Sequence, residues 1–239
     1  MPSSQALDAI LSDLVAANHI LYAQGVVDAF GHISARDPSR PDRFWISRSR
    51  APGLVTRDDL LCLDLDGNAV DDERRSYLER FIHAEIYRVR PDVMSVLHNH
   101  SPTVVPFSVT GVPFRPVCHV CGFLTGRTPV FEIRECAGAG TDLLVRDSRL
   151  GAALAQTLGD KNVTLMRGHG VTVVANSVRQ AVYRGVYTEL NAKLLLQSLS
   201  LSQDVTSLTD DEARAAEAGS PGQIERTWDL WMRDAQSRE

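Results

Sequence analysis

The stretch Val93-Met94-Ser95-Val96-Leu97-His98-Asn99-His100-Ser101-Pro102 joins an apolar run to two histidines that are separated by one residue. Residues 93–97 predict a buried strand. Side chains two positions apart on a strand point to the same face, so His98 and His100 can hold one ion between them. The alternative is a pair of unrelated surface histidines. Serine followed by proline is typical of a helix start, so the pair is expected at the end of a strand, where ligands commonly bind in α/β proteins.

A further histidine lies between two glycines in Arg167-Gly168-His169-Gly170, directly after an apolar run at residues 163–166. Flanking glycines allow the backbone to turn sharply and a ligand to approach closely. Core packing does not account for a histidine at such an apex. We therefore expect His169 to be a third metal ligand rather than a histidine capped within its own turn.

Glu79 lies in a segment, residues 77–90, whose pattern predicts a helix. Positions 79, 82, 83 and 86 share one face of that helix, and Ile82 and Ile86 make the face apolar. Glu79 and His83 would then face inward, where a buried carboxylate needs a partner such as a metal ion. The alternative is a solvated carboxylate that pairs with His83 one turn later. We interpret His83 as a core histidine, or one that supports a ligand, rather than as a ligand itself.

The segment Cys118-His119-Val120-Cys121 combines two thiols with a histidine. A C-x-x-C pair can be a redox pair or half of a zinc site, but the sequence has no second C-x-x-C to complete such a site. We interpret the two cysteines as buried strand residues, and His119 as a residue that supports the site or contacts substrate. The 4 cysteines of this chain do not form a disulfide framework.

The rest of the chain alternates helical and strand patterns without an internal repeat or a glycine-rich phosphate loop. Helices are predicted at residues 4–24, 147–158 and 177–200, and strands at residues 30–36, 44–47, 61–65, 129–133, 163–166 and 171–174. Residues 203–222 are polar and predict a loose linker. Ile224, Trp228 and Trp231 then share one face of a final helix, which would pack on the chain's own core or on a neighbouring subunit.

The overall composition argues against two classes of partner. The formal net charge is −5 and the pI is about 5.8, whereas a nucleic-acid binder carries a basic footprint. We find no apolar stretch that approaches the roughly 20 residues needed to span a bilayer, and no signal-peptide pattern at the start of the sequence. We therefore expect no nucleic-acid partner, no membrane and a cytoplasmic location.

Taken in order, these motifs resemble the class II aldolase/adducin superfamily over roughly residues 5–200. Gly31-His32-Ile33-Ser34-Ala35-Arg36 is similar to the family's Gly-Asn-x-Ser-x-Arg, and Leu63-Asp64-Leu65-Asp66-Gly67 to its following Asp-rich strand and turn. The family's metal ligands, an acidic residue, paired histidines and a later His-Gly, fall on Glu79, His98, His100 and His169.

The resemblance implies a single α/β/α domain with a central, mostly antiparallel sheet. We place this metal-binding domain at residues 1–202, and a C-terminal linker and helical tail at residues 203–239.

Zinc, manganese, iron and cobalt all accept three histidines and a carboxylate, so the sequence does not decide which metal binds. No organic cofactor is expected. The family's usual assembly implies a homotetramer with active sites near subunit interfaces.

Departures from the family pattern bear on the substrate. Sugar-phosphate aldolases hold phosphate with small polar residues, and those positions here carry His32, Ser49-Arg50 and Tyr77-Leu78. Ser47-Arg48-Ser49-Arg50-Ala51-Pro52 resembles a decarboxylase branch that acts on hydroxylated aromatic dicarboxylates, such as dihydroxyphthalate or a hydroxypyridine dicarboxylate. Arginine matches a carboxylate with two parallel hydrogen bonds.

The expected substrate contacts follow from this branch. Arg48 or Arg50 would anchor one carboxylate, unless both lie in a solvated loop, and His32, Ser47 and Ser49 would orient it. The expected reaction is loss of CO₂ from an aromatic acid with an ortho hydroxyl, with the metal as Lewis acid.

Glu79 is the leading candidate for proton donor or shuttle, and His119 or a tyrosine from a neighbouring subunit are the alternatives.

Three other functions stay open: an aldolase that cleaves a hydroxy-ketone or sugar phosphate, a non-catalytic adducin-like interaction domain, and an iron oxygenase.

Overall fold

One mixed sheet runs through the computed structural model, which describes residues 4–219 and 221–237. Among these residues, seven strands pair in the order β3-β2-β1-β4-β7-β6-β5. Their bounds are β1 His32–Arg36, β2 Arg43–Ser47, β3 Leu60–Asp64, β4 Ser95–Asn99, β5 Val130–Phe131, β6 Val163–Met166 and β7 Gly170–Ala175. Neighbouring strands are antiparallel except for β5 and β6, so the prediction of a mostly antiparallel sheet is confirmed.

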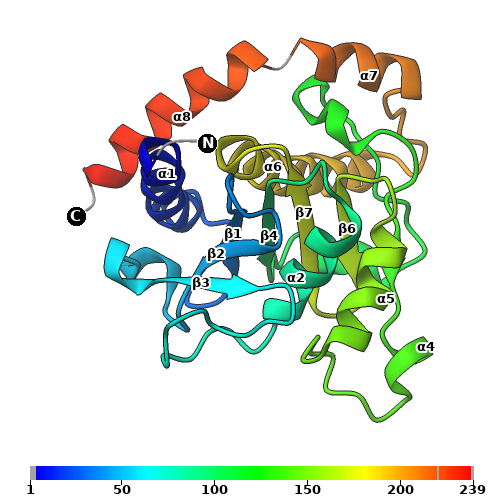
Figure 1. Cartoon of the computed structure of the whole chain (residues 1–239). Coiled ribbons are helices and arrows are strands. Elements are labelled where there is room, and N and C mark those ends of the chain that lie inside the picture. Colours follow the sequence, from blue (N-terminus) through cyan, green and yellow to red (C-terminus); the bar gives the residue numbers. More distant parts are fainter. Residues whose placement is uncertain (1–3, 220, 238–239) are drawn as a thin grey trace.

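Helices cover both faces of the sheet, which gives the α/β/α arrangement that the resemblance implies (Figure 1). One core joins the sheet to α1 (Ser4–Ala23), α6 (Val178–Leu201) and α8 (Pro221–Gln236). A second core on the opposite face joins it to α2 (Arg80–Val89) and α5 (Ser148–Leu158). The remaining helices are α3 (Val105–Val109), α4 (Arg134–Ala137), α7 (Asp210–Ala218) and the 3-10 turns η1 (Pro52–Leu54), η2 (Arg57–Asp59) and η3 (His119–Leu124).

Helix α1 corrects the expectation about apolar stretches. By length and composition alone, its residues 5–23 are long and apolar enough to cross a membrane, so the statement that no stretch approaches this length is wrong. Leu14, Ala17, Ile20 and Leu21 are buried in the core that α1 shares with α6 and the sheet. Core packing therefore accounts for the apolar composition of α1 in this fold.

The C-terminal region is more ordered than a loose linker. Helix α7 forms inside residues 203–222, with a reciprocal capping box between Thr209 and Glu212, and its Ala213 is fully buried against η3. The linker prediction is therefore wrong for α7, and residue 220 lies outside the described residues. Trp228 and Trp231 of α8 are buried in the core beside α1 and α6, so packing of the tail on its own chain is confirmed.

Three predicted boundaries move near the end of β4. Helix α2 begins at Arg80, so Glu79 is its N-cap residue and does not lie inside the helix. Strand β4 extends to Asn99 and includes His98, two residues beyond the predicted strand. Helix α3 begins at Val105, after a turn in which the hydroxyl of Ser101 accepts the backbone N–H of Val104 at 3.0 Å.

The two cysteines of the C-x-x-C segment do not lie on a strand. Cys118 precedes the 3-10 turn η3, and Cys121 lies inside it with its thiol directed at the carbonyl of Tyr187, 3.3 Å away. The strand interpretation is therefore wrong. All four cysteines are free, which confirms the absence of a disulfide framework.

Helix α5 packs closely against α2 at Gly151, so a larger residue at this position is expected to destabilise the fold. A Cβ built on Gly151 of α5 would lie 2.5 Å from the backbone carbonyl oxygen of Phe81, and backbone cannot move aside cheaply. Gly151→Ala should lower the free energy of unfolding by about 1–3 kcal/mol, because overpacking outweighs the better helix propensity of alanine. Urea denaturation measures the change. Gly140→Ala, where no atom lies within 4 Å of the added carbon, is the matched control; equal stability of both variants would contradict the packing argument.

Candidate metal centre

Four side chains from three separate stretches of the sequence meet at the end of β4. His98 lies on β4 and His100 directly follows the strand, His169 lies in the turn between β6 and β7, and Glu79 precedes α2. One ligand atom from each residue lies within 4.8 Å of the other three. The structure therefore brings together the four residues that the sequence predicts as ligands.

Separations between these atoms match the size of a metal ion. His169 Nε2 lies 3.1 Å from His100 Nε2 and 3.5 Å from Glu79 Oε2, and His98 Nε2 lies 3.7 Å from the same oxygen. Four ligand atoms at roughly 2.1 Å from one ion would be about 3.4 Å apart in a tetrahedral arrangement. These three distances bracket that value.

The ring of His98 is oriented by the backbone and leaves one nitrogen without a protein partner. Its Nδ1 lies 3.2 Å from the carbonyl oxygen of Val171, so Nδ1–H donates to that oxygen and the lone pair of Nε2 faces the other ligands. Nε2 is buried and has no hydrogen-bond partner among the described residues. Because an unpaired buried polar atom is unfavourable, the site fits a cation that would accept this lone pair.

Glu79 is oriented in the same way. Its Oε1 accepts the backbone N–H of Val145 at 2.9 Å, which turns Oε2 toward His98 and His169. The carboxylate is buried, with 7% of the residue exposed. His83, the partner in the alternative interpretation, bonds His32 and Ser34 instead, so the solvated Glu79–His83 pair is not formed.

Glycines bring the turn of His169 against the end of β4. Gly168 has φ +64°, a conformation that other residues rarely adopt. A Cβ on Gly170 would overlap the carbonyl oxygen of Asn99, so only glycine permits this approach of β7 to β4. The close approach holds the ring of His169 opposite that of His100, with ring centroids 4.8 Å apart.

A cavity of about 390 Å³ opens beside the four ligands. Glu79 and His100 form part of its wall. The wall also contains two aromatic rings, a histidine and an arginine, contributed by Phe30, Tyr77, His32 and Arg50. Aromatic faces together with a cationic group suit a flat, anionic ligand.

The two arginines of the loop after β2 occupy different positions. Arg48 directs its Nε at Asp59 Oδ1, 2.6 Å away, and does not line the cavity. Arg50 lines the cavity; its Nη1 donates to Asp59 Oδ1 at 3.4 Å, and its Nε lies 3.4 Å from Asp59 Oδ2 without a hydrogen bond. Burial raises the pKa of Asp59, but hydrogen bonds from Thr56 and Arg48 outweigh it and the pKa is lowered, so this carboxylate stays ionised beside both guanidinium groups.

The two serines of this loop also occupy different positions relative to the cavity. Ser49 lines the cavity, whereas Ser47 does not and lies 2.9 Å from the hydroxyl of Tyr77. The Tyr77 hydroxyl donates to the carbonyl of Arg50. Its polar end is therefore bound by the loop after β2, and its ring forms part of the cavity wall. The resemblance already places Tyr77 at a position where sugar-phosphate aldolases hold phosphate. Nothing in the local sequence pattern identifies Asp59 as the partner of both arginines, since that pairing depends on long-range contacts.

His32 lies beside the proposed ligands. Pairing of β1 with β4 places it opposite His98, and the two ring centroids are 5.1 Å apart. Burial, and then the neighbouring histidines, lowers the pKa of His32 well below its ordinary value, so the ring is neutral.

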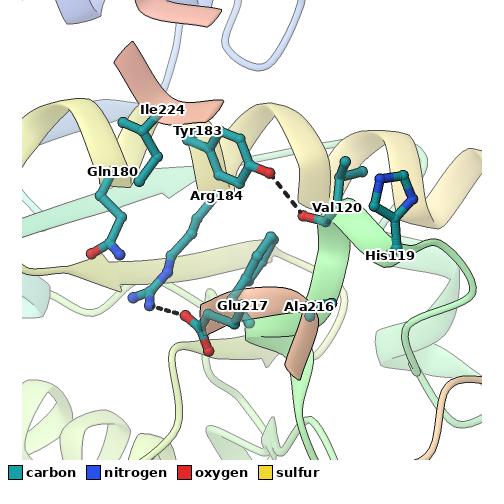
Figure 2. Close-up of a pocket in the computed structure, with 10 residues that line it drawn as sticks. His119, Val120, Gln180, Tyr183, Arg184, Ala216, Glu217 and Ile224 are labelled. Carbon is teal, nitrogen blue, oxygen red and sulfur yellow. Dashed lines mark hydrogen bonds and ion pairs between the residues drawn. The ribbon is translucent and has the colours of Figure 1, made fainter. Parts of the chain in front are cut away.

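His119 lies away from this cavity within its own chain. It is exposed on η3 and lines a second, very small hollow between η3, α6 and α7 (Figure 2). The interior of that hollow is occupied by an ion pair between Arg184 and Glu217 and by a hydrogen bond from Tyr183 to the carbonyl of Val120. A role for His119 in chemistry at the metal would require a second copy of the chain.

Comparisons with known proteins agree with this geometry. Residues 12–196 match the model of the class II aldolase and adducin N-terminal domain. The chain is 37% identical to decarboxylase tropJ of Talaromyces stipitatus, over 92% of this chain and 91% of that protein. It is 32% identical to 3,4-dihydroxyphthalate decarboxylase of Arthrobacter keyseri, over 89% and 88%. The structure of L-fuculose 1-phosphate aldolase from Glaciozyma antarctica superposes with a TM-score of 0.78 at 22% identity, over 99% and 92%, which shows a shared fold.

The geometry predicts that loss of one imidazole disables metal binding. His98→Ala should weaken zinc binding at least about 100-fold, more than the 10–100-fold expected for loss of a residue that only supports a ligand. Isothermal titration of the apoprotein with zinc measures the affinity, and circular dichroism checks the fold. His119→Ala should bind zinc like the unmodified protein. Unchanged affinity in folded His98→Ala would exclude His98 as a ligand.

Proposed function

The chain belongs to the class II aldolase and adducin family, and on that premise we propose that it is a metal-dependent, non-oxidative decarboxylase of a hydroxylated aromatic carboxylate. The single observation that carries the proposal is the cavity in which Glu79 and His100 share a wall with Arg50, His32 and Tyr77. A planar acid can reach the proposed ligands there while its second carboxylate meets a guanidinium. The names of the two decarboxylase relatives support the same reaction class.

The proposed residues divide the work between binding and proton transfer. When bound by Glu79, His98, His100 and His169, a divalent ion would supply Lewis-acid chemistry at the ring hydroxyl. Arg50 would hold the carboxylate that stays, with Ser49 at its side, and the ring of Tyr77 would pack against the substrate ring. In the reaction the bond between ring carbon and carboxylate breaks, CO₂ leaves, and a proton takes its place on that carbon.

Glu79 is our proposed proton shuttle at Oε2. This oxygen faces the ligands and the cavity, whereas Oε1 is bound by the backbone of Val145. Arg48, bound to Asp59, would keep that carboxylate in place beside Arg50, and Ser47 would do the same for Tyr77. His119, or a tyrosine of a neighbouring subunit, would contribute only in an assembly.

An aldolase acting on a sugar phosphate is the main rival. The aldolase whose structure is similar is 22% identical, a likeness of fold alone, whereas the two decarboxylases are 37% and 32% identical over most of the chain. The aromatic wall and the single arginine at the cavity favour a planar acid over a tetrahedral phosphate. Detection of an aldehyde product, or of oxygen consumption, would identify an aldolase or an oxygenase instead.

The proposed function also includes a cellular location and an oligomeric state. We propose a cytoplasmic homotetramer with active sites near subunit interfaces, which is the usual arrangement of the family. Phe30, Leu54 and Leu78 are exposed near the loops that bound the cavity and are available for such contacts. Zinc, manganese, iron and cobalt are all suitable for the ligand set, and no organic cofactor forms part of the proposal.

Metal removal tests the reaction. Protein that is treated with a chelator and verified as metal-free should release no CO₂ from 3,4-dihydroxyphthalate or related ortho-hydroxy aromatic acids. Adding back zinc, manganese, iron or cobalt should restore release, and the best ion identifies the metal. Trapped CO₂ and loss of substrate absorbance provide the measurements. Full activity of the verified metal-free protein would refute the proposal.

Arg50→Ala tests the carboxylate anchor. Loss of a hydrogen bond to a charged group weakens binding by about 1.5–3 kcal/mol, so KM should rise about 10–100-fold while kcat changes less. Steady-state kinetics on the best acid of the screen provides both constants. Arg57→Ala is the control, because Arg57 pairs with Asp8 on the surface and does not line the cavity. An unchanged KM in Arg50→Ala would remove this residue from the substrate site.

A further inference from the structure

A continuous chain of hydrogen bonds leads from the cavity into the core. His32 Nδ1 lies 2.7 Å from His83 Nε2, His83 Nδ1 lies 2.6 Å from Ser34 Oγ, and Ser34 Oγ lies 2.8 Å from Tyr87 Oη. All four residues are buried, and only His32 lines the cavity. Three of these positions carry side chains that the proposed reaction does not otherwise use.

Regular secondary structure fixes the geometry of this chain. His32 and Ser34 are two positions apart on β1 and share one face of the sheet, and His83 and Tyr87 are one turn apart on α2. The ring of Phe44 stacks on His83, with 10° between the planes, and holds it in place. The four groups therefore occupy rigid positions between the sheet and α2.

The His83 imidazole is neutral, because burial lowers its pKa to about 3, so one of its nitrogens donates and the other accepts. In the His32–His83 contact one ring must donate and the other accept. The direction of that single bond decides which nitrogen of His32 carries the proton.

Tyr87 sets the direction. Its phenol is buried and stays protonated, because burial raises its pKa, so its O–H needs an acceptor. Ser34 Oγ is the side-chain acceptor within reach.

The remaining bonds follow from this one by counting donors. Among the described residues, Tyr87 Oη and His83 Nδ1 are the two hydrogen-bond partners of Ser34 Oγ. Since Ser34 Oγ accepts from Tyr87, and a buried hydroxyl must also donate, its own hydrogen goes to His83 Nδ1. His83 Nδ1 is then an acceptor, so the proton of His83 lies on Nε2 and is donated to His32 Nδ1. The proton of His32 must therefore lie on Nε2, the ring nitrogen that the chain leaves unengaged. The reverse direction would leave the buried Tyr87 hydroxyl without an acceptor, which is unfavourable.

We propose that His32 presents its Nε2–H as a fixed hydrogen-bond donor to an oxygen of the bound aromatic acid, and that His83 is the positioning residue that sets this tautomer, with Ser34 and Tyr87 behind it. The proposal rests on the proposed function for the identity of the ligand. It makes His32 a donor beside Arg50, and it excludes His32 as the base. A net proton cannot come through the chain, since it would leave a tyrosinate in the core.

Nitrogen NMR of the zinc-loaded protein tests the tautomer directly. With ¹⁵N-histidine labelling, the multiple-bond ¹H–¹⁵N pattern shows which nitrogen of each ring carries hydrogen, and loss of a signal in His32→Asn assigns His32. Protons on Nε2 of both His32 and His83 are expected. In Tyr87→Phe, a mixture of tautomers should replace this state. A proton on Nδ1 of His32 in the unmodified protein would overturn the proposal.

Ligand binding tests the donor role without requiring turnover. Phthalate, an aromatic dicarboxylate without the ring hydroxyl, is the probe, and titration calorimetry measures its dissociation constant. His83→Leu breaks the chain and should weaken phthalate binding about tenfold. His83→Gln is the rescue, because its amide can accept from Ser34 and donate to His32, and it should bind phthalate within about twofold of the unmodified protein.

The outcomes separate this proposal from the proposed function. Release of CO₂ together with the Nδ1 tautomer of His32 would overturn the positioning role and leave the decarboxylase intact. The expected tautomer and phthalate series without CO₂ release would support the positioning role and refute the decarboxylase. Equal phthalate affinity in His83→Leu and the unmodified protein, or no binding by either, would overturn the donor role. If His83→Leu does not fold, the tautomers of the unmodified protein and of Tyr87→Phe decide.

Discussion

One electrostatic constraint governs this molecule: a carboxylate oxygen and three imidazole nitrogens face one another in a buried space. Burial is the largest cause of the lowered pKa of both His98 and His100, so protonation of these rings is disfavoured. Without a positive charge among them, Glu79 Oε2 and the nitrogen lone pairs would repel each other and lack partners. A divalent cation would resolve all of these problems at once.

Backbone groups, more than side chains, hold this arrangement. The carbonyl of Val171 orients His98, and the N–H of Val145 orients Glu79. Gly170 allows the main chain of β7 to meet that of Asn99. Because main-chain groups are present whatever the side chains are, the ligand geometry tolerates extensive substitution elsewhere. The similar aldolase structure shares this fold at 22% identity.

Local pattern was sufficient for some features of the site and insufficient for others. The strand that leads to His98, and the glycine turn around His169, are visible because an apolar run and glycine have local physical causes. The sequence pattern predicts Glu79 inside a helix, because a helix pattern does not mark its own first residue, whereas Glu79 is the N-cap residue. The difference between Arg48 and Arg50 depends on Asp59, which β2–β3 pairing brings near. Helix α7 escaped prediction because only Ala213 of its polar sequence is buried.

The polarity of the cavity explains why a planar acid suits it better than a phosphate. Phosphate presents acceptor oxygens in three dimensions and is best held by several small donors and backbone N–H groups. Here the donors are the guanidinium of Arg50, the single small hydroxyl of Ser49 and, in our proposal, one N–H of His32, while the ring of Tyr77 closes a third side. A planar guanidinium binds a carboxylate in its own plane, and an aromatic ring packs against a flat ligand. A carboxylate conjugated with an aromatic ring is flat, so it can make both contacts. The cavity would then select its substrate by shape as much as by charge. A tetrahedral anion of equal charge is not flat, so it cannot bind the Arg50 guanidinium and pack against the Tyr77 ring at the same time.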